Sequence, residues 1–85
     1  MAKTFQLNIL TPEKTVYAGS AASLTAPGEA GYLGILADHA PLATTLLAGK
    51  ISFKDEAGKQ TVVESQGKGF LEVFKNEVTV ILKGP

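Results

Sequence analysis

Apolar and polar residues alternate along several short stretches of the chain. Phe5, Leu7 and Ile9 alternate with polar neighbours, and this period of two is typical of a strand that buries one face. The other stretches expected to form strands are 16–18, 24–26, 32–36, 51–54, 60–64, 70–74 and 78–82. Many short strands at close spacing, separated by glycine-containing turns, predict an all-β sandwich or barrel.

The polar residues between the later strands predict two hairpins. In residues 55–59, Gly58 supplies any positive φ that the turn needs. In residues 75–77, Asn76 tolerates the left-handed conformation. Both turns therefore join antiparallel neighbours.

Two glycine-containing stretches are expected to interrupt regular structure. Gly19 and Ser20 are expected to end the strand that begins at Val16. The stretch GKGF at 67–70 lacks the spacing and the hydroxyl of a phosphate-binding loop, and it lies between two strands. It therefore predicts a bend or a bulge that requires glycine.

The segment PLATTLLAG at 41–49 is consistent with two structures. It fits a short helix with Pro41 at the first helical position and Gly49 as the stop. It equally fits a strand, because Thr44 and Thr45 are β-branched. Periodicity does not separate the two for a short apolar run, so both remain open on this basis.

The composition restricts the class of protein. A chain of 85 residues is long enough for one small domain, residues 1–85. It has no cysteine, which excludes disulfides and thiolate metal sites. No stretch approaches the roughly 20 apolar residues of a membrane span, and the N-terminus does not read as a signal peptide. We therefore expect a soluble protein without direct insertion into lipid.

The charges argue against a nucleic-acid partner. Eight basic residues balance eight acidic ones, and every basic residue is lysine. Arginine is the usual residue for recognising phosphates and bases, and the lysines here are dispersed rather than clustered. We therefore expect no nucleic acid among the partners.

His39 is the only histidine, and it follows Asp38 in the stretch GYLGILADHAP. Adjacent residues on an extended chain point to opposite sides, so Asp38 is badly placed to orient His39 as a catalytic base. One histidine without cysteine makes a zinc site improbable, and the acidic residues are too dispersed for calcium. The sequence therefore predicts no catalytic residue, no metal and no cofactor.

The apolar residues between 26 and 47 exceed what one face of a sheet needs. They either fill the core or mark a surface for a partner. Both interpretations remain open from the pattern alone.

Three motifs follow one another along the chain: NILTPEKTVYAG at 8–19, APGEAGYLGILADHAPLATTLLAG at 26–49 and GKGFLEVFKNEVTVI at 67–81. Together they resemble the amino-terminal domain of the epsilon subunit of F-type ATP synthases. The resemblance covers nearly the whole chain. It implies a flattened ten-stranded β-sandwich of two sheets, in which PLATTLL belongs to a strand. Most members continue into a helical hairpin, which we do not expect within residues 1–85.

The resemblance implies a non-catalytic subunit of the rotary central stalk. Its expected partners are the gamma subunit and the polar loops of the membrane c-ring, and its expected role is to couple ion-driven rotation to ATP synthesis. The expected location is the cytoplasmic face of a bacterial plasma membrane, peripherally bound, or alternatively a plastid thylakoid membrane.

The resemblance also assigns contact residues by position. The residues expected to contact the gamma subunit are Thr11, His39 and Leu42. The residues expected to contact the c-ring are Glu29, Gly31 and Tyr32. Many family members carry an acidic residue at the position of Tyr32, which here offers apolar area and a hydroxyl instead of a charge.

A lipoyl- or biotinyl-type carrier domain is the alternative, because such domains are also flattened β structures of about this length. They require a lysine at an exposed hairpin tip in a characteristic setting. Lys54 and Lys59 flank the 55–59 turn, but neither has that setting. The carrier function is therefore the weaker of the two interpretations.

Overall fold

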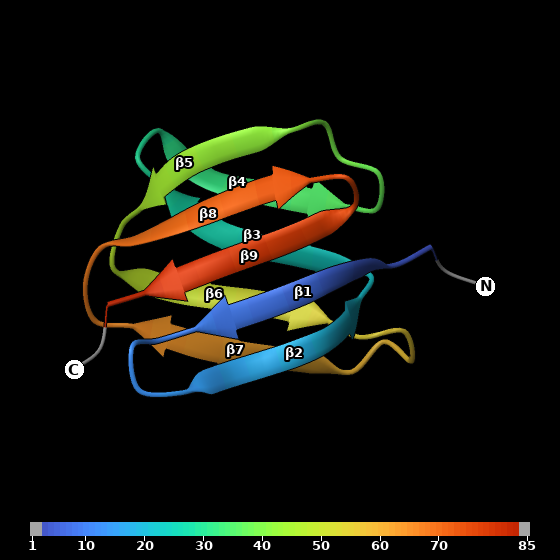
Figure 1. Ribbon diagram of the computed structural model, residues 1–85, viewed down its shortest axis with the longest axis horizontal. Helices are drawn as coiled ribbons and strands as arrows, with labels where there is room; N and C mark the ends of the chain where they lie inside the picture. Colours follow the sequence, from blue (N-terminus) through green and yellow to red (C-terminus); the bar gives the residue numbers. More distant parts are fainter. Residues whose placement is uncertain (1–2, 84–85) are drawn as a thin grey trace.

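The computed structural model describes residues 3–83, and it confirms the all-β class (Figure 1). The strands are β1 (Phe5–Leu10), β2 (Thr15–Ala21), β3 (Ser23–Gly28), β4 (Gly31–Leu36), β5 (Leu42–Leu46), β6 (Gly49–Lys54), β7 (Gln60–Ser65), β8 (Gly69–Phe74) and β9 (Glu77–Leu82). Residues 3–83 contain no helix, and hence none of the length and apolarity that crossing a membrane requires.

The strands form two layers. We call β2-β1-β9-β8-β5 sheet I and β4-β3-β6-β7 sheet II. In Figure 1 sheet I lies in front and sheet II behind it. The two sheets are joined at a single paired position, Gly28 of β3 opposite Leu46 of β5, so hydrogen bonding runs continuously from one layer to the other. The domain is therefore a sandwich whose two sheets are joined at one corner, where β3 and β5 end.

The strand count differs from the expected ten. Residues 3–83 form nine strands, and the longer stretches between them are turns or irregular: 11–14, 37–41, 55–59 and 66–68. The segment that was consistent with helix or strand is a strand: β5 pairs along its whole length with β8. Pairing with β8, which lies far away in the sequence, determines that this segment is a strand and not a helix.

The first and last strands lie side by side. β1 and β9 are parallel, with Leu7 opposite Val78 and Ile9 opposite Val80. Every other paired strand is antiparallel within the part of the chain that the structure describes. The parallel pair ties the two ends of the chain into the middle of sheet I.

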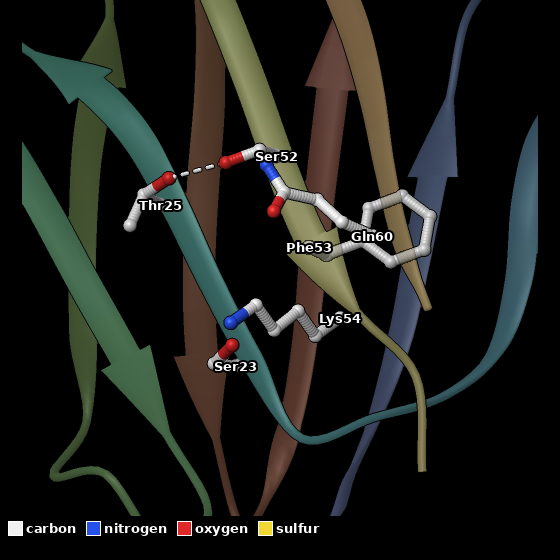
Figure 2. A pocket seen from close by; sticks show the side chains of 6 residues that line it. All are labelled: Ser23, Thr25, Ser52, Phe53, Lys54 and Gln60. Carbon is white, nitrogen blue, oxygen red and sulfur yellow. Dashed lines mark hydrogen bonds between the residues drawn. The ribbon is translucent and has the colours of Figure 1, made fainter. Parts of the chain in front are cut away.

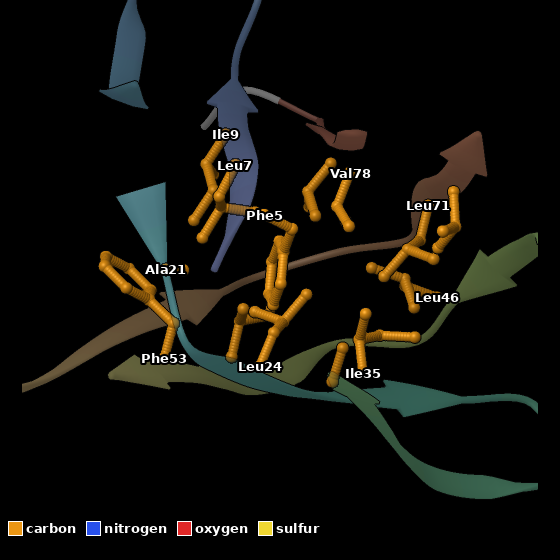
Figure 3. Packing of buried hydrophobic residues seen from close by; sticks show 14 of the residues in the cluster. Phe5, Leu7, Ile9, Ala21, Leu24, Ile35, Leu46, Phe53, Leu71 and Val78 are labelled. Carbon is orange, nitrogen blue, oxygen red and sulfur yellow. The ribbon is translucent and has the colours of Figure 1, made fainter. Parts of the chain in front are cut away.

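The core lies between the layers and is made of aliphatic and aromatic side chains from both (Figure 3). The alternating residues that predicted β1, namely Phe5, Leu7 and Ile9, are all buried there. They face residues of sheet II such as Leu24 and Phe53. Period-two burial, clearest in β1, β6, β8 and β9, therefore leaves the opposite side chains of these strands on the two outer faces.

The two hairpin turns have the predicted chemistry. Gly58 has a φ of 89° in the β6–β7 turn. In the β8–β9 turn Lys75 and Asn76 have φ values of 50° and 62°. Two consecutive residues with positive φ match the right-handed twist of the flanking strands.

Strand β2 is longer than predicted. It continues through Gly19 and Ser20 and pairs with β1 as far as Ala21. The hydroxyl of Tyr17 donates a hydrogen bond to the Ser20 carbonyl over 2.8 Å, and its ring lies over Gly19. The aromatic ring covers the glycine and keeps the strand regular where the glycine alone predicted a stop.

Gly69 lies where two strands approach closely. A Cβ atom at this position would lie 2.7 Å from the carbonyl oxygen of Ile81. Together with the bend at residues 66–67, this confirms that GKGF is a structural turn into β8.

Candidate functional site

The outer face of sheet I carries large apolar side chains on neighbouring strands. Phe70 of β8 is opposite Ile81 of β9, and Ile81 is opposite Leu10 of β1. Phe70 is 44% exposed and Ile81 is 50% exposed, while Leu10 is partly buried. We call these three residues the apolar row. Exposed apolar area of this kind, contiguous across three strands, is typical of a surface that a partner covers.

The rest of this face is polar along β1 and β9. Asn8 donates a hydrogen bond to the Glu77 carboxylate over 3.0 Å, and Gln6 donates to Asn8 over 3.1 Å. Glu72 lies opposite Thr79 in the middle of the face. The outer face of sheet I therefore has an apolar part and a hydrogen-bonding part, the combination found in protein interfaces.

A second apolar group lies at the far end of β8. Phe74 is 55% exposed, and the Lys75 ammonium lies 5.4 Å from the centre of its ring. This end of the sheet also holds the β4–β5 connection, because the Asp38 amide donates to the Asn76 side chain over 2.8 Å.

Thr11 lies directly beside the apolar row, since it follows Leu10 at the end of β1. Its hydroxyl accepts a hydrogen bond from the Lys14 amide over 3.2 Å, and its amide donates to the Lys14 carbonyl over 2.9 Å. These bonds fix the β1–β2 turn. Thr11 therefore has a fixed position at the end of β1, where it lines a hollow together with Val16 of β2 and Val63 of β7.

His39 lies at the end of sheet I opposite to Thr11, next to the β8–β9 turn. Its Nδ1 donates a hydrogen bond to the Ala40 carbonyl over 2.7 Å. The Asp38 side chain does not orient His39; its carboxylate instead lies 3.8 Å from the Lys3 ammonium. Leu42 is partly buried and packs against the core, so only part of its side chain faces solvent.

The three residues expected to contact the gamma subunit therefore do not form one cluster. Thr11 lies at the end of sheet I where β1 ends, and His39 and Leu42 lie at the end where β5 begins (Figure 1). The two ends are joined by the outer face that carries the apolar row and Phe74. A single partner reaches both Thr11 and His39 only if it extends along the whole face, whereas Leu42, paired with the buried Val73, lies on the inner side of sheet I.

The three residues expected to contact the c-ring lie together at the β3–β4 turn. Glu29, Gly31 and Tyr32 are all exposed, and Tyr32 is 66% exposed. This turn and the β1–β2 turn lie at the same end of the molecule, at the left of Figure 1. The Tyr32 hydroxyl and Pro27 both lie close above Gly49, so the ring lies across the outer face of sheet II.

Two shallow hollows lie on the surface formed by residues 3–83. The larger, of about 280 Å³, lies on the outer face of sheet II, where Thr25 and Ser52 share a hydrogen bond of 2.7 Å (Figure 2). The smaller, of about 150 Å³, is open between Val16 of β2 and Val63 of β7. Within residues 3–83 no three His, Asp or Glu side chains are grouped to hold a metal ion.

Reasoning from the sequence missed Phe70, Phe74 and Ile81 as surface residues. A signal was present: Phe70 and Phe74 share the period-two parity of Glu72, and a charged residue in a strand marks the solvent side. In the run FLEVF, the charge of Glu72 therefore indicates that Phe70 and Phe74 lie on the solvent side.

Comparison with known proteins identifies the family. Residues 4–84 match the model of the family described as ATP synthase, Delta/Epsilon chain, beta-sandwich domain. An ATP synthase epsilon chain of Natranaerobius thermophilus is 47% identical over 79 residues, which are 93% of this chain and 56% of that protein. An ATP synthase epsilon chain of Desulfatibacillum aliphaticivorans is 43% identical over 81 residues, 95% of this chain and 57% of that protein. The chain thus spans a little over half the length of these curated relatives.

Solved structures share the fold. A chain of the Euglena gracilis mitochondrial ATP synthase superposes with a TM-score of 0.87 at 21% identity, over 93% of this chain and 50% of that one. A chain of the central stalk and c-ring of the Tetrahymena thermophila mitochondrial ATP synthase gives 0.76 at 14% identity, over 98% of this chain and 66% of that one. From the family model and the sequence relatives we conclude that this chain belongs to the beta-sandwich domain family of ATP synthase delta and epsilon chains.

Proposed function

We propose that this domain is a non-catalytic rotor component of an F-type ATP synthase, which binds the gamma subunit and the c-ring and so couples ion-driven rotation to ATP synthesis. The observation that carries the proposal is the apolar row on the outer face of sheet I, in a chain of this family. Family membership also favours this role over a lipoyl or biotinyl carrier.

The gamma subunit is the partner proposed for the outer face of sheet I. A partner that covers this face removes Phe70, Ile81 and Phe74 from water, and buried apolar area contributes roughly 25 cal/mol per Å² before the costs of association. To reach Thr11 and His39 as well, such a partner extends past both ends of this face. Its contact with Leu42 is limited to the exposed part of that side chain.

The polar loops of the c-ring are the partner proposed for the β3–β4 turn. Glu29 offers an exposed carboxylate, Gly31 an exposed backbone and Tyr32 an exposed ring. This turn lies on a different surface from the outer face of sheet I, so one domain has room for both partners at once. The protein is then held at the periphery of a coupling membrane, and the family suggests the cytoplasmic face of a bacterial plasma membrane.

Titration calorimetry of the chain with the gamma subunit of the same organism tests the proposal. We expect saturable one-to-one binding. Absence of binding at any accessible concentration would contradict the gamma assignment. A photo-activated cross-linker placed at Glu29 in the assembled synthase tests the second partner: we expect a product with the ring subunit, and products with other subunits alone would contradict the ring assignment.

A further inference from the structure

Strand β4 is an unprotected edge of sheet II. Its only strand partner within residues 3–83 is β3. Its sequence, GYLGIL, contains no charged residue and no proline, which are common devices against pairing with another chain. Tyr32 and Leu36, 66% and 64% exposed, are the most exposed large hydrophobic residues of the described chain. The strand thus offers both a free backbone edge and apolar side chains.

The direction of the backbone groups along this edge follows from Pro27. Proline has no N–H, and the Pro27 carbonyl accepts the Leu47 amide over 2.8 Å, so its backbone polar group points away from β4. Pro27 is paired with Tyr32, and paired residues in antiparallel strands both point toward each other or both point away. Tyr32 therefore turns its N–H and C=O to the open edge. By alternation, Gly34 and Leu36 do the same.

We propose that this edge pairs with β4 of a second copy of the chain, antiparallel about a two-fold axis at Gly34. In that register Gly34 is opposite Gly34, and Tyr32 of each copy is opposite Leu36 of the other. The residues with outward-pointing backbone groups then face one another, as a hydrogen-bonded ladder requires. The carbonyl of Leu36 already accepts the His39 amide over 3.3 Å, and its second lone pair is available.

The strand sequence is self-complementary in this register. A shift by one residue would place outward-pointing groups opposite inward-pointing ones and break the ladder. A shift by two residues in either direction would leave Tyr32 or Leu36 without an apolar neighbour. A Cβ atom at Gly34 would meet nothing within 4 Å, so there is free space at the two-fold axis for the diagonal Tyr32 ring.

The other edge strands lack this combination. β7 carries Glu64 near one end, and β2 and β5 expose no large hydrophobic side chain. An interface of one strand per copy falls below the standard size of stable complexes, so the dimer is expected to be weak and to depend on concentration. The inference does not rest on the proposed function. The dimer covers Tyr32, so it and the proposed ring contact exclude each other.

Sedimentation equilibrium of the full 85-residue chain over a wide concentration range tests the dimer. We expect the average mass to rise toward twice that of one chain. Gly34→Lys places two lysines opposite each other at the axis, and Gly34→Glu places two glutamates there, so each variant alone is expected to stay monomeric. An equal mixture of the two variants is expected to recover the dimer as a heterodimer.

The matched control is Val62→Lys, which adds a charge at a 52% exposed apolar position on β7. It is expected to leave association unchanged. Circular dichroism checks that every variant is folded, and Gly34 has both the free space and an ordinary φ that these substitutions require. A wild-type chain that stays monomeric, a mixture that behaves like its components, or dissociation by Val62→Lys would each overturn the proposal.

Discussion

The Asp38 amide donates a hydrogen bond to the Asn76 Oδ1 over 2.8 Å, which attaches the β4–β5 connection to the β8–β9 turn. The Asn76 amide group also donates to the Thr4 carbonyl over 2.9 Å, and its backbone carbonyl accepts the Gln6 amide over 3.1 Å. One turn residue thus joins three segments at the end of the molecule that carries His39. The position of His39 on the proposed gamma surface depends on this link.

We expect Asn76→Ala to destabilise the fold by about 1–3 kcal/mol, because it removes two side-chain hydrogen bonds and places alanine at a φ of 62°. Urea unfolding measures the loss. Asn76→Gly is the matched control: it loses the same hydrogen bonds but tolerates the positive φ, so its loss should be smaller. Equal stability of Asn76→Ala and wild type would show that the link does not hold the turn.

Gly69→Ala is expected to destabilise the domain by about 1–3 kcal/mol, because its Cβ would lie 2.7 Å from the Ile81 carbonyl oxygen and β8 and β9 would have to separate. Gly34→Ala is the control, since its Cβ meets nothing within 4 Å. Gly34→Ala should be neutral or slightly stabilising by thermal unfolding. Similar melting temperatures for the two variants would contradict the predicted close approach.

Much of this fold could be predicted from local features. Alternation in β1 indicated its buried face, and Gly58 and Asn76 marked the hairpin turns by their tolerance of positive φ. Local features failed at β2, where the ring of Tyr17 lies over Gly19 and lets the strand continue. The contact that decides β2 is also local, two to three residues along the chain, but turn propensity treats Gly19 by itself and does not include the Tyr17 ring.

Long-range pairing could not be predicted from these patterns. The parallel pairing of β1 with β9 and the pairing of β5 with β8 join residues far apart in the sequence. The local pattern of a short apolar run such as 42–46 does not indicate which strand it pairs with. The assignment of this run to a strand therefore came from the family resemblance. The separation of Thr11 from His39 likewise depends on the order and direction of the strands in sheet I, which local patterns do not determine.

His39→Ala is expected to weaken binding to the gamma subunit without unfolding the domain. The side chain makes one local hydrogen bond, to the Ala40 carbonyl, so its loss should cost stability no more than about 1 kcal/mol. Calorimetric titration against the gamma subunit, with circular dichroism for the fold, checks both parts. Unchanged affinity would remove His39 from the proposed contact.

Tyr32→Ala is expected to reduce coupled ATP synthesis in reconstituted vesicles while leaving gamma binding intact, because Tyr32 lies on the β3–β4 surface and not on the outer face of sheet I. Tyr32→Phe keeps the ring and removes only the hydroxyl, so it separates apolar contact from hydrogen bonding. Full coupling with Tyr32→Ala would argue against a ring contact at this residue.

The affinity of the gamma subunit for a chain with the double substitution Phe70→Thr and Ile81→Thr tests the proposed surface. Threonine keeps strand propensity and removes most of the exposed apolar area. The control is Val62→Thr, a 52% exposed position on sheet II that matches Ile81 at 50%. We predict a loss of at least about tenfold for the double variant, or about 1.4 kcal/mol, and unchanged affinity for the control. Equal affinities for the double variant and the wild type would show that the gamma subunit does not bind this face.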